Sequence, residues 1–163
     1  MKNNLLPPGF KDELFDHSFD EHKFKNIINN IFISNGYQLV KSPLLEYSNK
    51  TNEVNSFIIK IKNEKNKYVL RSDITMQVAR IAASRLSKKT RPLKLCYYGQ
   101  VVRKTGSILR PEKEFLQVGA ECIGADSYLA DVEMLELAYQ SLIAVGIKNI
   151  SIELSSHVFL SYI

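Results

Sequence analysis

The 163-residue sequence predicts an α+β domain in which helices flank a mostly antiparallel sheet. Apolar residues recur at helical spacing in three segments, at about 19–35, 74–86 and 128–145. Two long strand-like segments, 93–103 and 113–123, are separated only by a loop that contains glycine and proline, which favours antiparallel pairing. The order of elements is helix, strands, helix, hairpin, helix, strand, and this order favours an α+β fold over a doubly wound one.

The first half of the chain predicts a helix, a short strand and a hairpin. The helix begins at about Phe19 and ends near Asn35-Gly36, a helix-stop signal. Residues 37–40 follow as a short strand. Strands at 57–61 and 68–71 then form a hairpin around a polar turn.

The second half predicts two more helices and three strands. Ser72-Asp73 offers an N-cap to a helix whose apolar stripe runs from Ile74 to Leu86. After the two long strands, the third helix carries an apolar stripe: Tyr128, Val132, Leu135, Tyr139 and Leu142. Gly146 ends this helix, and the alternation of apolar residues over 150–154 predicts a final strand.

Composition limits the classes of function. The net charge is +5, but the lysines are scattered among many Asn and Ile residues, so we expect no dedicated nucleic-acid surface. No apolar run approaches the roughly 20 residues that span a bilayer. The N-terminal residues do not form a secretory signal, and we therefore expect a cytoplasmic protein without membrane contact.

The metal-binding residue types do not predict a metal site. Cys96 and Cys122 lie in apolar strand-like segments, and we expect them to be buried free thiols. His17, His22 and His157 have no second His or Cys at metal-ligand spacing, and we expect them at the surface or its boundary.

The strand from Glu114 to Ile123 carries the strongest functional signal. Side chains alternate between the two faces of a strand, and one face here is apolar and should pack on helices: Leu116, Val118, Ala120 and Cys122. The other face offers an aromatic ring, an amide, a gap and a carboxylate: Phe115, Gln117, Gly119 and Glu121. Glycine inside a strand often marks a place where a ligand comes close. The alternative is a solvent-exposed sheet face with an incidental glycine.

Two further residues favour a binding site over an incidental glycine on an exposed face. Asp73 begins a helix just after a strand, and Arg103 ends the partner strand. Asp73 and Glu121 would take the ammonium of a zwitterionic amino acid, and Arg103 would take its carboxylate. A plain N-cap for Asp73 and a surface position for Arg103 remain the alternatives.

At these residues the chain resembles histidyl-tRNA synthetases. Residues 70–75, Leu-Arg-Ser-Asp-Ile-Thr, resemble their Leu-Arg-Pro-Glu-Gly-Thr segment. Residues 98–103 and 113–124 resemble the two strands of class II synthetase motif 2, and residues 43–46 resemble the motif 1 region. The resemblance extends from Pro7 onward, and it implies a class II aminoacyl-tRNA synthetase-like core that self-associates through the motif 1 region.

Several phrases are more similar to one branch, the regulatory subunits of ATP phosphoribosyltransferase. These phrases lie at residues 6–10, 71–82, 95–99 and 114–121, and long phrases are more specific than a single glycine motif. The resemblance implies a non-catalytic chain without a cofactor, which serves the first step of histidine biosynthesis. Its implied partner is the short-form ATP phosphoribosyltransferase catalytic subunit, with histidine as an effector.

The resemblance also implies a histidine pocket. Four positions match residues that hold the amino acid: Asp73, Thr75, Gln117 and Glu121. Arg103 matches the motif 2 arginine, which in synthetases meets the ATP α-phosphate and the amino-acid carboxylate. Arg103 and Phe115 are thereby implied to line a nucleotide-like pocket.

Departures from the synthetase pattern weigh against aminoacylation by this chain alone. Thr105 stands where histidyl-tRNA synthetases have a glutamate, and Lys113 replaces an arginine whose bidentate fork lysine cannot reproduce. The sequence ends at Ile163, before the Gly-Leu-Asp-Tyr-Tyr segment, motif 3 and the anticodon-binding domain. We therefore expect residues 1–163 to form a single partial class II core domain that is truncated at its C-terminus.

Two other functions stay open at this point. One is a split or degenerate histidyl-tRNA synthetase that binds histidine and ATP, with a second chain supplying motif 3. The other is a tRNA-binding module, which the basic balance allows but which no aromatic-plus-basic stacking motif supports.

Overall fold

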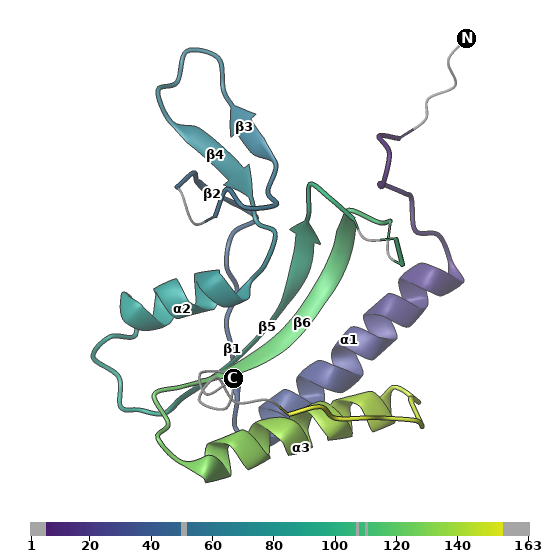
Figure 1. The fold of residues 1–163 in the computed structure, drawn as a ribbon, viewed down its shortest axis with the longest axis vertical. Helices are drawn as coiled ribbons and strands as arrows, with labels where there is room; N and C mark the ends of the chain where they lie inside the picture. The colour runs from purple at the N-terminus through teal and green to yellow at the C-terminus, as the bar shows by residue number, and fades with distance from the viewer. Residues whose placement is uncertain (1–5, 50–51, 107, 110, 155–163) are drawn as a thin grey trace, which may run out of the picture.

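A computed structural model of the chain describes residues 6–49, 52–106, 108–109 and 111–154, which form three helices and two three-stranded sheets (Figure 1). The helices are α1 (Asp16–Ser34), α2 (Thr75–Ala83) and α3 (Tyr128–Ala144). The α+β class expected from the sequence is confirmed, and so are all three helices.

The larger sheet has the strand order β1-β5-β6. Its strands are β1 (Gln38–Leu39), β5 (Leu93–Val102) and β6 (Glu114–Ile123). β5 and β6 pair antiparallel along their whole length, whereas β1 pairs parallel to β5. A parallel pair needs a long crossover, and the segment between β1 and β5, which includes the smaller sheet and α2, provides it.

The smaller sheet has the strand order β2-β4-β3 and is antiparallel throughout. Its strands are β2 (Leu45–Tyr47), β3 (Ile58–Lys60) and β4 (Lys67–Leu70). The hairpin formed by β3 and β4 is the one that the sequence predicts. The three-residue β2 was not predicted, because a strand this short has too few positions to show an alternation. Figure 1 shows this sheet projecting beyond the end of the larger one.

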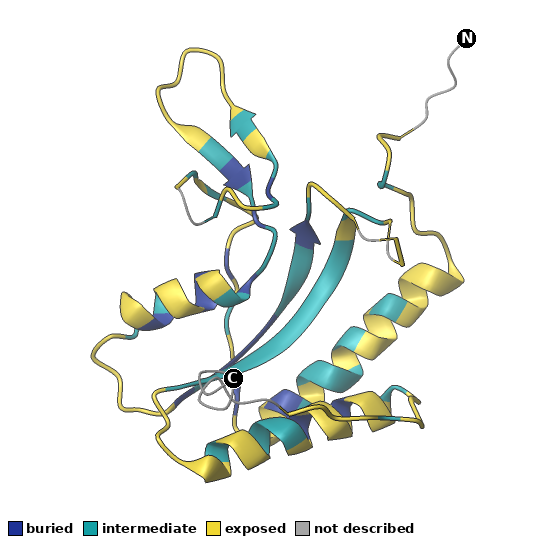
Figure 2. Ribbon diagram, viewed as in Figure 1, coloured by how far each residue is buried: buried dark blue, intermediate teal, exposed yellow. Residues whose placement is uncertain are grey.

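Helices cover both faces of the larger sheet. On one face, residues of α2 and β5 form a buried cluster: Ile74, Val78, Ala82, Leu93, Leu95, Tyr97 and Val101. On the other face, α1, α3, β5 and the residue before β1 contribute a second cluster: Phe32, Tyr37, Cys96 and Leu137. Val118 and Ala120 of β6 pack against this second cluster, which confirms that the apolar face of the strand meets helices. Figure 2 shows the buried positions concentrated in β5 and on the inward sides of the helices.

The helix ends follow local sequence signals. α1 begins at Asp16, three residues before the expected start, and it ends at Ser34 before Gly36, whose φ is +83°. The Ser127 Oγ accepts a hydrogen bond from the Leu129 N–H at 3.2 Å and so caps α3. Gly146 ends α3 as predicted.

Two expectations for the C-terminal part differ from the structure. The apolar stripe of α3 lies largely on its exposed side, while the opposite side, with Leu137 and Ser141, is buried. A helix that is apolar on both sides gives no periodic signal for which side is covered. The expected final strand is wrong for the described residues, because 150–154 have no strand conformation there.

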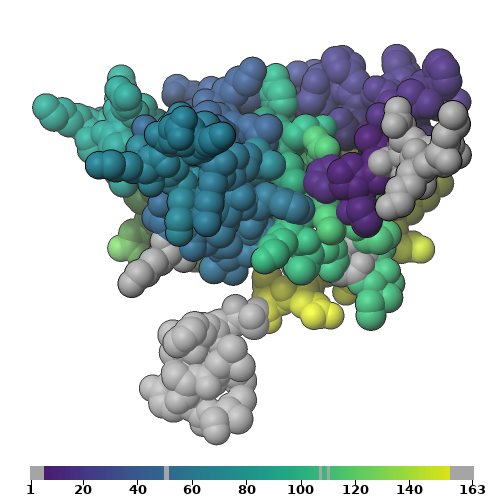
Figure 3. All heavy atoms as spheres, turned by 90° about the horizontal axis from the view of Figure 1, so that it is seen from above, coloured from purple at the N-terminus to yellow at the C-terminus, as the bar shows by residue number. Residues whose placement is uncertain are grey.

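The N-terminal segment packs against the start of β6. The Gly9 carbonyl accepts a hydrogen bond from the Lys113 N–H at 2.8 Å, and the rings of Phe10 and Phe57 lie 6.0 Å apart. Gly9 has φ +87°, and a Cβ there would lie 2.7 Å from the Lys113 Cγ, so only glycine fits. Figure 3, a view from above, shows the purple N-terminal segment against the green atoms of this region.

None of the helices in the described part of the chain is long and apolar enough to cross a bilayer. His17 and His22 are exposed as expected, and His157 lies outside the described residues.

Candidate functional site

The candidate site lies on the face of the larger sheet that α2 covers. In the register of β5 and β6, Gly99 is opposite Gln117 and Tyr97 is opposite Gly119. Directly opposite residues of an antiparallel pair share a face. The predicted site residues of β6 therefore lie beside the residues of β5 that pack under α2.

Gln117 connects this face to the start of α2. Its Oε1 accepts a hydrogen bond from the Ile74 N–H at 3.0 Å, and its Nε2 donates to the Asp73 Oδ2 at 3.0 Å. The other Asp73 oxygen accepts from the Thr75 N–H at 2.7 Å. The N-cap position of α2 is Ile74 rather than the expected Ser72-Asp73, but Asp73 still accepts a hydrogen bond from the first residue of the helix and is also joined to Gln117.

Tyr97 joins Thr75 to Glu121. The Tyr97 hydroxyl lies 2.9 Å from the Thr75 Oγ1 and donates to the Glu121 Oε1 at 3.1 Å. Burial of the ring is the main reason that the pKa of Tyr97 rises to about 12; the hydrogen bond with Thr75 opposes the rise, and the nearby Glu121 carboxylate contributes to it. The hydroxyl is therefore a protonated donor at neutral pH.

Gly119 makes room for Tyr97. A Cβ at this position would lie 2.6 Å from the Tyr97 Cζ, so a larger residue would displace the ring. The glycine was interpreted as a gap into which a ligand comes, but the space beside it holds the tyrosine. The sequence analysis did not select Tyr97, although its place opposite Gly119 follows once the strand register is known.

Arg103 lies at the end of β5, next to the first turn of α2. Its Nε donates to the Ser72 carbonyl at 3.2 Å, and its guanidinium carbon lies 5.0 Å from the centre of the Phe115 ring. The two terminal amino groups have no hydrogen-bond partner among the described residues. Arg103 is half-buried, so these groups can bind an anion that approaches the face.

The structure thus brings the predicted residues together. Hydrogen bonds link four of them through Tyr97 and the backbone of α2: Asp73, Thr75, Gln117 and Glu121. Arg103 stacks on the Phe115 ring beside this set. Its hydrogen bond to the Ser72 carbonyl places it next to Asp73. All six are partly exposed rather than sealed in the core. The arrangement offers two carboxylates, an amide, two hydroxyls and a guanidinium to a small zwitterion.

The two side chains that depart from the synthetase pattern contact neighbouring loops instead of the site residues. Thr105 donates through its backbone N–H and its hydroxyl to the Asn55 Oδ1, at 2.8 and 2.7 Å. The Lys113 ammonium lies 5.9 Å from the centre of the Phe57 ring. Both side chains therefore support the neighbouring loops.

The cysteines are free, as expected. Cys96 is buried on the opposite face of the sheet, and burial raises the pKa of its thiol. Cys122 is only partly buried, in contrast to the expectation. Among the described residues, no group of three or more His, Cys, Asp or Glu side chains is arranged to hold a metal ion.

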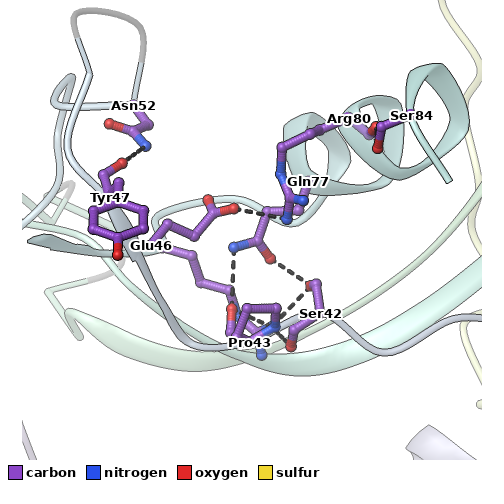
Figure 4. Close-up of polar contacts among 9 residues, drawn as sticks. Ser42, Pro43, Glu46, Tyr47, Asn52, Gln77, Arg80 and Ser84 are labelled. Atoms are coloured by element: carbon purple, nitrogen blue, oxygen red, sulfur yellow. Dashed lines mark hydrogen bonds and ion pairs between the residues drawn. The ribbon is translucent and has the colours of Figure 1, made fainter.

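A polar network next to the site orders the motif 1 region (Figure 4). The Gln77 Nε2 donates to the Pro43 carbonyl at 3.1 Å, and the Ser42 hydroxyl donates to the Gln77 Oε1. The Arg80 guanidinium and the Glu46 carboxylate are 2.9 Å apart. These contacts fasten β2 to α2, and sequence reasoning missed them because the partners are distant in the chain.

Beside this network lies a groove with a volume of about 610 Å³ between β2, β4 and α2. Exposed apolar and aromatic side chains line it, including Leu45, Tyr47 and Met76. The rings of Tyr47 and Tyr68 are stacked, with centres 5.4 Å apart.

Comparisons with known proteins show similarity to histidyl-tRNA synthetases and to ATP phosphoribosyltransferase regulatory subunits. A family profile described as histidyl-tRNA synthetase matches residues 9–163. The ATP phosphoribosyltransferase regulatory subunit of Rhodospirillum rubrum is 38% identical over 159 residues, which cover 93% of this chain and 41% of that protein. The regulatory subunit of Clostridium acetobutylicum is 34% identical over 155 residues, which cover 91% of this chain and 38% of that protein. The chain therefore spans about two fifths of the length of these curated relatives.

Solved structures have the same fold. A Bacillus halodurans protein described as an ATP phosphoribosyltransferase regulatory subunit/histidyl-tRNA synthetase superposes with a TM-score of 0.78 at 26% identity, covering 91% of this chain and 40% of that one. The apo histidyl-tRNA synthetase of S. aureus has a TM-score of 0.73 at 24% identity, covering 88% and 35%. These superpositions confirm the class II synthetase-like fold.

Proposed function

The chain belongs to the histidyl-tRNA synthetase family, and from this premise we propose that it acts as a non-catalytic regulatory subunit of ATP phosphoribosyltransferase. Curated relatives at 33–39% identity carry this name, and they align with more than nine tenths of the chain. In this proposal residues 1–163 form a single partial class II core domain. The chain assembles in the cytoplasm with a short-form catalytic subunit, which performs the first step of histidine biosynthesis.

We further propose that the site under α2 binds histidine. The observation that carries this proposal is the set of Asp73, Gln117 and Glu121, linked by hydrogen bonds through Thr75 and Tyr97, next to the Arg103 amino groups that have no hydrogen-bond partner among the described residues. The two carboxylates would take the ammonium of the amino acid, and Arg103 would take its carboxylate. Thr75 and Tyr97 hold Glu121 in position for this role.

Feedback control follows if histidine binds the active and inactive assemblies with different affinities. Thr75 lies in α2 and Asp73 just before it, Arg103 follows β5, and Gln117 and Glu121 belong to β6. The same helix α2 also lines the groove of the motif 1 region, so a shift of α2 would change the histidine site and the groove together. We propose this groove as the place of self-association, because exposed Leu45, Tyr47 and Met76 provide apolar surface for a second copy.

One experiment tests the proposed role. The chain is co-expressed with a short-form catalytic subunit, and the activity of that enzyme is measured with and without the chain. We expect the two proteins to co-purify and the activity to depend on the chain. Full activity of the catalytic subunit alone, with no co-purification, would rule out the role.

A second experiment tests the site itself. Calorimetric titration with L-histidine is repeated on Glu121→Ala and on Glu136→Ala, which removes an exposed carboxylate of α3. Loss of a charge-assisted hydrogen bond is worth about 1.5–3 kcal/mol, so Glu121→Ala should weaken binding about tenfold or more. Glu136→Ala should bind like the original chain. Equal affinities for both variants would show that histidine does not use this face.

A specific observation favours a second candidate, a split or degenerate histidyl-tRNA synthetase. The Arg103 guanidinium over the Phe115 ring is suited to hold a nucleotide phosphate beside an aromatic surface. The contacts of Thr105 and Lys113 with neighbouring loops weigh against it, because those two positions would have to serve ATP. Pyrophosphate exchange that depends on histidine and ATP, with a candidate partner chain present, would establish this candidate in place of the first.

A further inference from the structure

Positive charge is concentrated in one stretch of the sequence. Residues 74–111 contain nine Lys or Arg residues and no Asp or Glu, so the rest of the chain carries a net negative charge. Four of the nine lie in the connection between α2 and β5, at the lower left of Figure 1: Arg85, Lys88, Lys89 and Arg91. All four are exposed.

The end of α2 accounts for only part of this charge. A helix C-terminus carries about half a negative elementary charge, and it attracts cations within its last turn. Arg80 occupies that turn and pairs with Glu46. Among the described residues, no carboxylate forms an ion pair with any of the four cations of the connection. Their charge can therefore attract an anion.

A cleft with a volume of about 350 Å³, here called the lysine cleft, lies beside this connection at the start of β1 and β5. Four of its side chains can donate hydrogen bonds: Gln38, Lys89, Thr90 and Lys94. Leu86 and Pro92 contribute an apolar wall, and the lining residues that the structure describes include no carboxylate. The volume lies at the lower end of the range of roughly 300–1,000 Å³ that small-molecule sites have.

Lys94 is held in position at one side of the lysine cleft. Its ammonium donates to both Glu133 carboxylate oxygens, at 2.7 and 2.8 Å, and lies 5.7 Å from the centre of the Tyr37 ring. Glu133 compensates the charge of Lys94, so the net positive charge of the cleft comes from Lys89. An ammonium has three N–H groups, and one of them remains for an acceptor in the cleft.

Hydrogen bonds hold the connection in shape. The Lys89 N–H donates to the Leu86 carbonyl, and the Leu86 N–H donates to the Ile81 carbonyl, both at 3.0 Å. The Arg91 guanidinium donates to the Ala82 carbonyl at 3.2 Å. A site that is formed before its ligand arrives loses less conformational entropy on binding.

We propose that the lysine cleft binds a small phosphate ester. Lys89 attracts the phosphate, and Lys94 and the Thr90 hydroxyl donate hydrogen bonds to its oxygens. The organic part of the ester lies on the apolar wall that Leu86 and Pro92 form.

The lysine cleft is separate from the proposed histidine site. Arg103 lies nine residues beyond Lys94 along β5, and a strand rises about 3.3 Å per residue, so about 30 Å separate the two cations. The proposal therefore goes beyond the proposed function and does not require histidine binding.

The test is an NMR titration of the 163-residue chain with phenyl phosphate, which combines a phosphate group with an apolar ring. We expect a Kd of about 1 mM or lower, with the amide signals of Lys89 and Thr90 shifting. Phenol, which lacks the phosphate, should not bind. Lys89→Gln should weaken binding at least tenfold, because it removes a charge-assisted hydrogen bond. Lys88→Gln removes the same charge from a position that does not line the cleft and should weaken binding less than threefold.

Circular dichroism checks that both variants keep the fold. No binding of phenyl phosphate by the original chain would overturn the proposal. Equal weakening by Lys88→Gln and Lys89→Gln would also overturn it, because the anion would then respond only to the general charge of the connection.

Two further measurements exclude other occupants. If Arg103→Gln loses phenyl phosphate binding while Lys89→Gln keeps it, the anion occupies the proposed histidine site and the proposal is wrong. It is also wrong if a single-stranded RNA binds the connection and phenyl phosphate does not displace it, because a nucleic-acid backbone would then be the ligand.

Discussion

The two faces of the larger sheet are built from alternate residues of the same strands, yet they differ in chemistry. The face toward α1 and α3 closes over Phe32, Cys96 and Leu137, with apolar side chains of β6 beside them. The face toward α2 has a comparable apolar cluster, but it also holds Gln117 and Glu121 in a hydrogen-bonded set that solvent can reach. One face therefore contributes mainly stability, while the other combines stability with the proposed binding site. Substitutions on the two faces should separate these contributions.

The largest effect is expected on the face toward α1 and α3. Phe32→Ala removes a ring that is 6% exposed and should lower the free energy of unfolding by about 4 kcal/mol. Ile33→Ala, at the neighbouring position that is 48% exposed, should cost less than about 1 kcal/mol. Urea unfolding of both variants measures the difference. Similar costs for the two would show that the Phe32 ring does not pack in this cluster.

The next effect concerns the contact between Gly119 and Tyr97. Gly119→Ala places a Cβ 2.6 Å from the Tyr97 Cζ and should lower the free energy of unfolding by about 3 kcal/mol, because ring and strand must move. The same substitution in a Tyr97→Ala background should cost much less, since the clash is gone. A double-mutant cycle measures this coupling. Additive costs would contradict the contact.

Alkaline pH should also reveal the contribution of Tyr97 to the free energy of unfolding. Its pKa is about 12 in the folded chain and about 10 in the unfolded chain, so its contribution to stability is fully present below pH 10 and is lost as the pH rises through 12. The corresponding loss in the free energy of unfolding between pH 10 and pH 12 is about 2 kcal/mol. Tyr97→Phe should show a decline that is smaller by this amount in urea unfolding at several pH values. An identical decline would mean that Tyr97 ionises equally in both states.

The smallest effect is expected from the amide that joins β6 to α2. Gln117→Leu keeps the approximate volume but removes both hydrogen bonds to Asp73 and Ile74, and it should cost about 1 kcal/mol. Gln140→Leu, on the exposed side of α3, is the matched control and should be close to neutral. Histidine titration of both variants sharpens the contrast between the faces, since only Gln117→Leu should also weaken binding. If Gln117→Leu leaves both quantities unchanged, the amide does not organise the site.

Much of the fold was predictable because the elements have strong periodic signals. β6 is the clearest case, since the alternation of its residues correctly assigns Val118 and Ala120 to the face that packs on helices. The helices at 74–86 and 128–145 also exist, although α2 ends at Ala83. The covered side of α3 was not predictable, because apolar residues on both sides of a helix do not tell which side meets the core.

The site was predictable in part. Asp73, Thr75, Arg103, Gln117 and Glu121 were selected from strand alternation and from the resemblance, and the structure brings them together, while their role in binding histidine stays a prediction. Tyr97 was missed because its role depends on the register between two strands, which one sequence does not give. The network around Gln77 was missed for the same reason, since its partners are 34 and 35 residues away.

Arg71 links the proposed histidine site and the proposed self-association groove through a single buried side chain. It donates to the Ser42 carbonyl and to the Gln100 carbonyl, both at 2.8 Å, and only Ser72 separates it from Asp73 in the chain. A second copy that docks at the groove and shifts Ser42 would therefore displace the carboxylate proposed to hold the amino acid. Under the proposed function, docking of a second copy would then change the affinity for histidine, and histidine would change the affinity of docking by the same factor.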